Sequence, residues 1–233
     1  MLGLGASLSI DTVASFSPLD VHPRLELWYK NAVGVTAEKW DDSSGSSNYA
    51  YQLDISKRAV VDDGGLNFEG SSNHHYDLKS AIEIVPEAPF MLFLVCTIES
   101  YDTQNSILGT GDNNVFLEIQ TNRRIRLRGA GSGTAISITY PSDTFAVEEK
   151  MVVGIKRDEG ITGNIHLYKN GTLITPTSQE ADTGAIIFNQ LASRNDDRFF
   201  DGIIHEFLFY STEDLLPPEI TKISEYLISE NGI

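Results

Sequence analysis

Residues 163–173, GNIHLYKNGTL, contain the strongest local structural signal in the chain. Apolar and polar residues alternate ahead of the Asn170-Gly171 pair, as they do in a strand with one buried face. Asn-Gly supplies the two residues with positive φ that a type I′ turn requires. The stretch therefore predicts a β-hairpin.

The same kind of pattern recurs on both sides of this hairpin. Short alternating or apolar runs are separated by clusters of Gly, Asn, Asp and Ser. Such frequent strands predict an all-β fold, an antiparallel two-sheet sandwich or barrel, and not alternating strands and helices. Trp28 and Trp40 are predicted to anchor the core between the sheets. The further strand segments are 24–29, 115–119, 136–140 and 151–155.

The two ends of the chain differ from this middle region, 24–210. Residues 1–23 are small and apolar, and we interpret them either as an assembly arm that adds to a neighbouring subunit or as the sandwich's own first strand. Residues 211–233 predict one helix packed on the sandwich, because Pro217 and Pro218 suit a first helical turn and Gly232 suits a stop. The arm residues expected to make contacts are Leu2, Leu4, Leu8, Ile10 and Phe16.

The chain is strongly acidic. Its 233 residues include 17 basic and 33 acidic side chains, which gives a formal net charge of −16. Nucleic acids and anionic lipid surfaces both attract basic proteins, so we expect neither nucleic acid nor a membrane as a partner. The only basic run, at 123–128, would place alternate arginines on one strand face, which we interpret as a solvated surface.

Several short motifs follow one another in order along residues 24–229. They are ELWY at 26–29, WDDSSG at 40–45, LNFEG at 66–70, ILG at 107–109, LYKNG at 167–171 and FDGIIHEFLFY at 200–210. In this order they resemble the concanavalin A-like jelly roll, specifically the laminin-G-like domains of tailed-phage structural proteins. The resemblance implies a two-sheet antiparallel jelly-roll sandwich with an extended N-terminal arm and one C-terminal helix.

The resemblance also implies a function. It indicates a non-enzymatic structural protein of a phage virion, either a capsid decoration or a tail-associated protein. The expected partners are other virion proteins, namely the major capsid or tail protein, and further copies of the chain in a homo-oligomer. A carbohydrate-binding module that adheres to host glycans is a second hypothesis, compatible with the first. A glycan hydrolase is the third.

Catalytic motifs do not support the third hypothesis. Glucanases with this fold share a strand with the motif Glu-x-Asp-x-x-Glu. Because side chains alternate between the two faces of a strand, the motif places its carboxylates on one face. The chain has no such triplet, and Gly131-Ser132-Gly133 lacks the Gly-x-Ser-x-Gly spacing of a nucleophile elbow. Cys96, the only cysteine, lies in an apolar run and is predicted to be buried. We expect no enzymatic activity unless distant loops assemble a site.

Two kinds of binding residue are predicted in the loops. The resemblance implies a calcium ion at the sandwich rim, and loops rich in aspartate offer the oxygen ligands that calcium prefers, although we favour acidic solvated turns as the explanation of these loops. Tyrosines beside Ser, Asn and Asp would serve as platforms for sugar rings. The candidate calcium ligands are Asp41, Asp42, Asp62, Asp63, Asp112, Asp196 and Asp197, and the candidate sugar-binding residues are Tyr49, Tyr51, Tyr76 and Tyr101.

Overall fold

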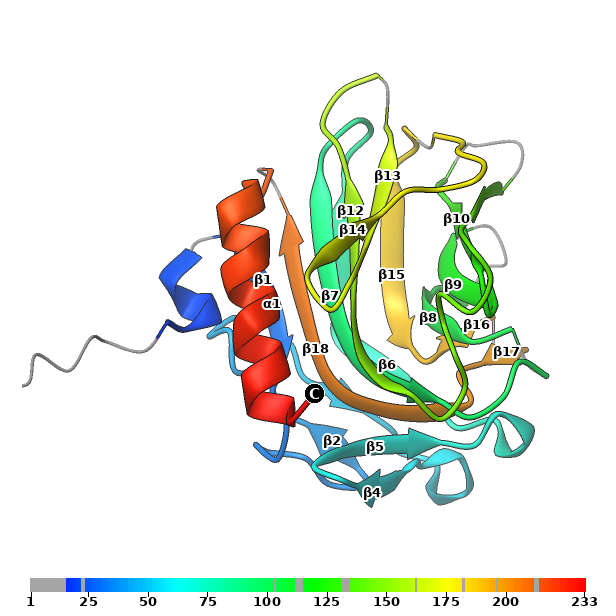
Figure 1. Ribbon diagram of the computed structural model, residues 1–233. Coiled ribbons are helices and arrows are strands. Elements are labelled where there is room, and N and C mark those ends of the chain that lie inside the picture. The colour runs from blue at the N-terminus through cyan, green and yellow to red at the C-terminus, as the bar shows by residue number, and fades with distance from the viewer. Residues whose placement is uncertain are drawn as a thin grey trace, which may run out of the picture.

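The computed structural model describes residues 16–21, 24–102, 104–111, 115–130, 135–161, 163–181, 183–195, 197–211 and 214–233. Over these residues the chain forms two antiparallel sheets stacked as a sandwich, with one α-helix at its carboxyl-terminal end (Figure 1). The predicted all-β jelly-roll sandwich is therefore confirmed. No helix in the described part of the chain is long and apolar enough to span a membrane.

The first sheet has eight strands, among them the longest strand of the described residues, Gly202–Ser211. At its centre β7 (Phe90–Ile98) pairs with β12 (Lys150–Arg157) on one side and with β18 (Gly202–Ser211) on the other. In spatial order its strands are β14 (Thr172–Ile174), β13 (Ile165–Lys169), β12 (Lys150–Arg157), β7 (Phe90–Ile98), β18 (Gly202–Ser211), β5 (Gly65–Phe68) and β4 (Val60–Asp62), and β1 (Leu25–Tyr29) also pairs with β18.

The hairpin predicted from residues 163–173 joins β13 to β14 in this sheet. Lys169 lies opposite Thr172 across the ladder. Asn170 and Gly171 have φ angles of 48° and 77°, the positive values that the Asn-Gly pair predicts. The prediction of a hairpin is confirmed.

The second sheet also has eight strands and lies across the core from the first. In spatial order its strands are β11 (Ile136–Thr139), β10 (Arg124–Arg128), β9 (Phe116–Thr121), β8 (Ser106–Gly109), β15 (Ile186–Leu191), β6 (Tyr76–Ile84), β3 (Ala50–Tyr51) and β2 (Lys39–Trp40). A separate small hairpin follows β15 and consists of β16 (Ser193–Arg194) and β17 (Arg198–Phe199). The described residues also form three short 3-10 helices: η1 (Pro18–Val21), η2 (Ile55–Lys57) and η3 (Gly70–Ser72).

The main core fills the space between the two sheets. Trp40 is fully buried there, and its ring stacks on Tyr29 with 5.6 Å between the ring centroids. Cys96 is also buried in this core, as predicted, and burial raises the pKa of its thiol to about 12. The aromatic side chains thus fill the interior of the sandwich, which is the usual role of large apolar groups in stacked sheets.

A second apolar layer lies on the outer face of the first sheet. On β18, Phe207 and Phe209 point into the main core, whereas Leu208 and Tyr210 point outward and are buried by other groups. Trp28 belongs to this outer layer, so its predicted place in the core between the sheets is wrong. Both faces of the central strands are therefore buried.

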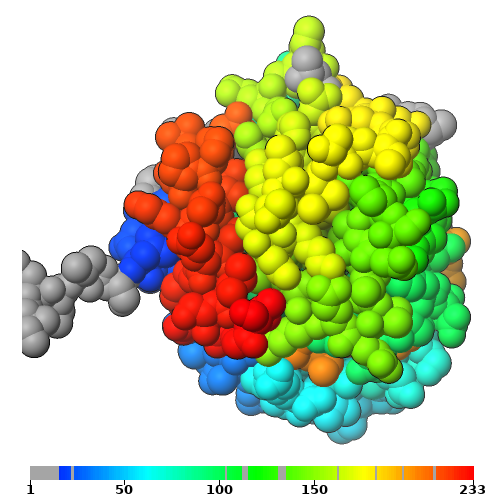
Figure 2. Space-filling view, viewed as in Figure 1, coloured from blue at the N-terminus to red at the C-terminus, as the bar shows by residue number. Residues whose placement is uncertain are grey.

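Helix α1 (Pro217–Asn231) covers this second layer. Figure 1 shows α1 alongside β18, away from β8, β9 and β10. The helix begins at Pro217 and is followed by Gly232, whose φ of 67° ends it as predicted. Its buried Ile220, Ile223 and Leu227 pack on the sheet. In Figure 2 the helix surface abuts that of the β13–β14 hairpin.

A buried carboxylate ties the end of α1 to the sheet. Glu206 of β18 accepts hydrogen bonds from Trp28 Nε1 at 2.7 Å and from Asn231 Nδ2 at 2.9 Å. Burial raises the pKa of Glu206, and these two donors oppose that rise. Neither donor carries a charge, so the carboxylate is held by hydrogen bonds and not by a direct ion pair.

The described part of the predicted arm packs on the same chain. Phe16 lies edge-on to Tyr226 of α1, with 6.4 Å between the ring centroids. Val21 of η1 is buried in the layer beneath the helix. The other predicted arm residues, Leu2, Leu4, Leu8 and Ile10, lie outside the described residues.

Candidate functional site

The loop that joins β7 to β8 contributes to two pockets. Its backbone passes through Gln104 and Asn105, with positive φ angles of 67° and 40°. Asn105 Nδ2 donates to Ser100 O at 2.6 Å, and Asn105 Oδ1 accepts from the Asp201 backbone N–H at 2.8 Å. The Asp201 carboxylate accepts a hydrogen bond from Ser100 Oγ. These bonds fix the loop to the residue that precedes β18.

The first pocket contains Tyr101, one of the four tyrosines predicted to bind sugar. Its volume is about 380 Å³, a size suited to a small ligand. The Tyr101 hydroxyl donates to Phe145 O at 2.5 Å, which fixes the half-buried ring, and burial raises the pKa of this hydroxyl. We call this cavity the Tyr101 pocket, and its lining residues are Tyr101, Thr121, Asn122, Asp143, Ala146 and Val147.

An amide and a carboxylate form the polar wall of the Tyr101 pocket. Asn122 Nδ2 donates to Asp143 Oδ1 at 2.9 Å. Asn122 lies in the turn between β9 and β10, where its carbonyl accepts from the Phe145 backbone N–H at 2.8 Å. The turn that carries Asp143 is closed by Thr144 Oγ1, which donates to Pro141 O at 2.7 Å. Both polar groups are therefore held in place by the backbone around them.

This combination of groups suits a ligand with many hydroxyls. The Asp143 carboxylate offers a second oxygen as an acceptor, and the Thr121 hydroxyl can donate and accept. Ala146 and Val147 add apolar surface next to the Tyr101 ring. A sugar presents hydroxyls at its edge and C–H groups on its face, so an aromatic ring beside fixed polar groups matches both.

The second pocket is lined by the same loop, through Asp102 and Gln104. Its volume is about 330 Å³. It contains two acidic side chains, Asp102 and Asp197, and both are exposed to solvent. We call it the Asp102 pocket, and its remaining lining residues are Gly70, Ser71, Asn73, Gln104, Arg198 and Phe199.

The other predicted sugar-binding tyrosines lie outside both pockets. Tyr76 is fully buried, and its hydroxyl donates to Ala37 O at 2.7 Å, so the prediction of a sugar platform there is wrong. Its polar neighbours in the sequence pointed to a loop, but Tyr76 begins β6 and faces the core. Tyr49 and Tyr51 are half-buried and lie edge-on to each other, with 5.8 Å between ring centroids. Two ammonium groups lie over the Tyr49 ring, those of Lys39 and Lys79, each 5.2 Å from its centroid.

The candidate calcium ligands do not converge. Within the described residues, no three His, Cys, Asp or Glu side chains form a group that could hold a metal ion. Asp42 caps its own loop by accepting from the backbone N–H groups of Trp28, Ser44 and Asn48 at 2.9–3.0 Å.

The remaining candidates are paired elsewhere or separate. Asp41 pairs with Lys39, Asp63 pairs with Lys150, and Asp62 is exposed on β4. Asp197 lies in the Asp102 pocket. Asp112 and Asp196 lie outside the described residues.

The sequence predicted Tyr101 as a sugar-binding residue but did not indicate the residues that share its pocket. Asn122 and Asp143 lie in turns far from Tyr101 along the chain, and the topology of the second sheet brings the three together. A turn signal was available, because Asn122 follows an alternating strand and Asp143 follows Pro141. Nothing in the sequence pairs the two turns with each other.

Comparisons with known proteins support the fold. No family model and no curated protein matches the chain. Among solved structures, the sialidase of Trypanosoma rangeli superposes with a TM-score of 0.59 and 16% identity over 89% of this chain, which spans only 33% of the sialidase.

Two smaller structural neighbours match as well. Domain 4 of AbnA, an extracellular arabinanase from Geobacillus stearothermophilus, has a TM-score of 0.51 and 14% identity over 86% of this chain and 98% of that domain. The binding domain of Paraclostridial Mosquitocidal Protein 1 has a TM-score of 0.55 and 14% identity over 88% of this chain and 52% of that one. The chain therefore shares the β-sandwich fold found in carbohydrate-binding and glycosidase-like proteins.

Proposed function

We propose that this chain is a glycan-binding jelly-roll module whose sugar site is the Tyr101 pocket. The observation that carries the proposal is the half-buried Tyr101 ring beside the fixed Asn122–Asp143 pair in one cavity. The structural neighbours support the class of ligand, because the AbnA domain was solved with arabinotriose and the sialidase with sialic acid. The second functional hypothesis from the sequence thus becomes the leading one.

The experiment is a glycan array followed by calorimetry with the best ligand, with arabinotriose included as a defined probe. Replacing Asp143 by Ala removes a charged acceptor from an exposed turn, so we expect affinity to fall roughly tenfold or more. The Tyr101→Ala variant should bind more weakly still. Tyr49→Ala removes a half-buried tyrosine outside the pocket and should bind like the wild type. If the protein binds no glycan on the array, or if all variants bind equally well, the proposal is overturned.

We also propose that the module binds glycans without cleaving them. Glycoside hydrolysis uses two carboxyl groups, and the general acid is kept protonated by an apolar environment. The Asp102 pocket holds two carboxylates, but both are exposed. A reducing-sugar assay on the array ligands should therefore give no product, whereas product formation that disappears in Asp102→Asn would establish the hydrolase instead.

The finer proposal is display of this module on a phage particle. Two observations support it. The motifs along residues 24–229 follow the order that resembles tailed-phage structural domains, and the chain is acidic, with a net charge of −16. In this proposal the protein is a capsid decoration or tail-associated protein in contact with other virion proteins and further copies of itself. Mass spectrometry of purified particles tests it: hundreds of copies would indicate a decoration, a handful would indicate the tail, and absence would refute it.

A further inference from the structure

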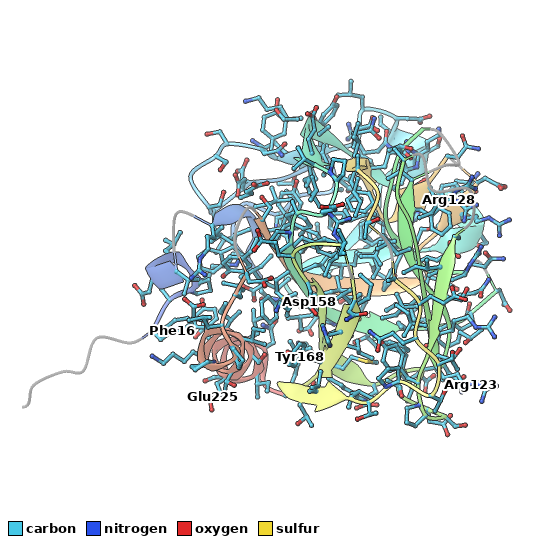
Figure 3. All side chains as sticks on the ribbon, turned by 90° about the horizontal axis from the view of Figure 1, so that it is seen from above. Phe16, Arg123, Arg128, Asp158, Tyr168 and Glu225 are labelled. Carbon is cyan, nitrogen blue, oxygen red and sulfur yellow. The ribbon has the colours of Figure 1, made fainter. Side chains whose placement is uncertain are left out.

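Five arginines gather on the outer face of the second sheet. Arg124, Arg126 and Arg128 alternate along β10 with buried residues, so all three point away from the core. Figure 3 places Arg123 and Arg128 on the side of the molecule opposite Phe16 and Glu225 of α1. The helix thus covers one outer face of the sandwich, and the arginines lie on the other.

The β16–β17 hairpin brings two more arginines to this face. Arg194 of β16 lies opposite Arg198 of β17. The hairpin lies directly on β8 at Gly109, where an added Cβ would be 2.4 Å from Ser193 O. We call the five residues together the arginine face: Arg124, Arg126, Arg128, Arg194 and Arg198.

A buried carboxylate positions the centre of the arginine face. Glu118 is 0% exposed and accepts from Arg126 at 2.8 Å and from Arg194 at 3.1 Å. Both guanidinium groups also lie over the ring of Phe116, 5.3 Å and 3.7 Å from its centroid. Arg194 is only 9% exposed. The more exposed Arg126 guanidinium, held by a carboxylate and an aromatic ring, loses little further freedom when it binds a ligand.

Positive charge remains after these pairs are formed. Among the described residues, no acidic side chain pairs with Arg124 or Arg128. Glu118 is the only carboxylate that pairs with any of these four arginines in the described part of the chain, so Arg124, Arg126, Arg128 and Arg194 together with Glu118 sum to a charge of +3. Arg198 lies 4.0 Å from Asp197 and is balanced by it. The Nε atoms of Arg124 and Arg128 are buried and lack a hydrogen-bond partner within the described part of the chain.

We propose that the arginine face binds an acidic polysaccharide and that its guanidinium groups pair with the carboxylate groups of the polysaccharide. This inference rests on the proposed glycan-binding function and names its ligand class. Alternate residues of a strand are spaced by about 7 Å, so the β10 arginines form a row that fits an extended chain with charges at intervals. Guanidinium groups form two parallel hydrogen bonds with a carboxylate, which makes arginine well suited to this ligand.

The surroundings favour a polysaccharide over a nucleic acid. Nucleic acids carry a dense row of phosphates, about one charge per 1.7 Å of duplex, so a chain of net charge −16 repels them more strongly than a polysaccharide with one carboxylate per sugar ring. Single strands are bound through bases stacked on exposed aromatic rings. The aromatic ring at the centre of the arginine face, Phe116, is only 1% exposed and is covered by Arg194.

The test uses polygalacturonate as the acidic probe, its fully methyl-esterified form as a neutral match, and a single-stranded DNA of equal charge. The double variant Arg124→Gln/Arg128→Gln leaves the pairs to Glu118 intact. Lys30→Gln/Lys222→Gln changes the net charge equally at α1, on the opposite side of the molecule, and is the matched control. Binding is measured by calorimetry at two salt concentrations.

We expect wild type and control to bind polygalacturonate and not its ester, and the arginine variant to bind roughly tenfold or more weakly. Absent polygalacturonate binding, an unaffected arginine variant, or tighter binding to DNA would overturn the proposal. Asp143→Ala separates the two sites, because it should weaken arabinotriose binding and leave polygalacturonate binding unchanged. If no neutral sugar binds but polygalacturonate does, the Tyr101 pocket fails as a sugar site and the arginine face stands.

Discussion

Replacing Gly109 by Ala should destabilise the protein by displacing the hairpin that carries Arg194. An ideal Cβ at Gly109 would lie 2.4 Å from Ser193 O and 2.8 Å from Arg194 Cα, and both are backbone atoms. Backbone yields less readily than a flexible side chain, so the cost should fall toward the upper part of the usual range for overpacking, about 1–3 kcal/mol. Gly111 provides a matched control, because a Cβ there meets nothing within 4 Å.

The assay is urea denaturation of both variants, followed by tryptophan fluorescence. Gly109→Ala should lower the midpoint without a change in slope, whereas Gly111→Ala should shift stability by less than about 1 kcal/mol, and in the stabilising direction if its backbone geometry is compatible. Polygalacturonate binding should weaken only in Gly109→Ala. Equal stability of the two variants would refute the reasoning that β16 lies against β8.

Three further outcomes are expected. Leu227→Ala removes a fully buried side chain beneath α1 and should cost about 2–5 kcal/mol in chemical denaturation, whereas Leu216→Ala, at a 59% exposed position, should cost far less. Burial, aided by Lys150, lowers the pKa of His205 to about 4. The unfolded chain then binds a proton that the folded chain excludes, so His205 should lower the unfolding free energy by at most about 1.4 kcal/mol per pH unit as the pH falls from 6.5 to 4. This contribution should be lost in His205→Gln, which leaves the smaller dependence of other groups such as His74, whose pKa burial also lowers. Ellman's reagent should not react with Cys96 until the protein unfolds, and rapid labelling of the native state would contradict its burial.

Local patterns predicted the strands well because they depend on neighbouring residues. The Asn170-Gly171 turn and the start and end of α1 follow from backbone preferences, which a sequence displays directly. Alternation along β18 places Phe207 and Phe209 on one face and Leu208 and Tyr210 on the other, as period-2 strand geometry requires. The sequence pattern did not indicate that α1 would bury the second face of this strand as well. For that reason Trp28 was assigned to the wrong layer.

The candidate site was harder to predict because its residues come from separate turns. Tyr101 and Tyr76 have similar polar neighbours in the sequence, yet one lines a pocket and the other lies in the core. The aspartates illustrate the same limit: Asp42 accepts hydrogen bonds from its own loop, so a sequence rich in loop carboxylates does not indicate whether they converge on an ion. The arginines at 124, 126 and 128 share one face as predicted, but their connection to Glu118 and Arg194 depends on a hairpin that the sequence did not indicate.

The coverage of one outer face by α1 has a practical consequence for oriented attachment. Glu225 is exposed on the helix, on the side opposite the arginine face, and the single native thiol is sealed in the core. A cysteine introduced by Glu225→Cys would therefore be the sole reactive handle for coupling to a biosensor chip or bead. Molecules coupled through this cysteine would share one orientation, with the arginine face exposed to the solution. An acidic polymer could then bind to every immobilised molecule in the same way.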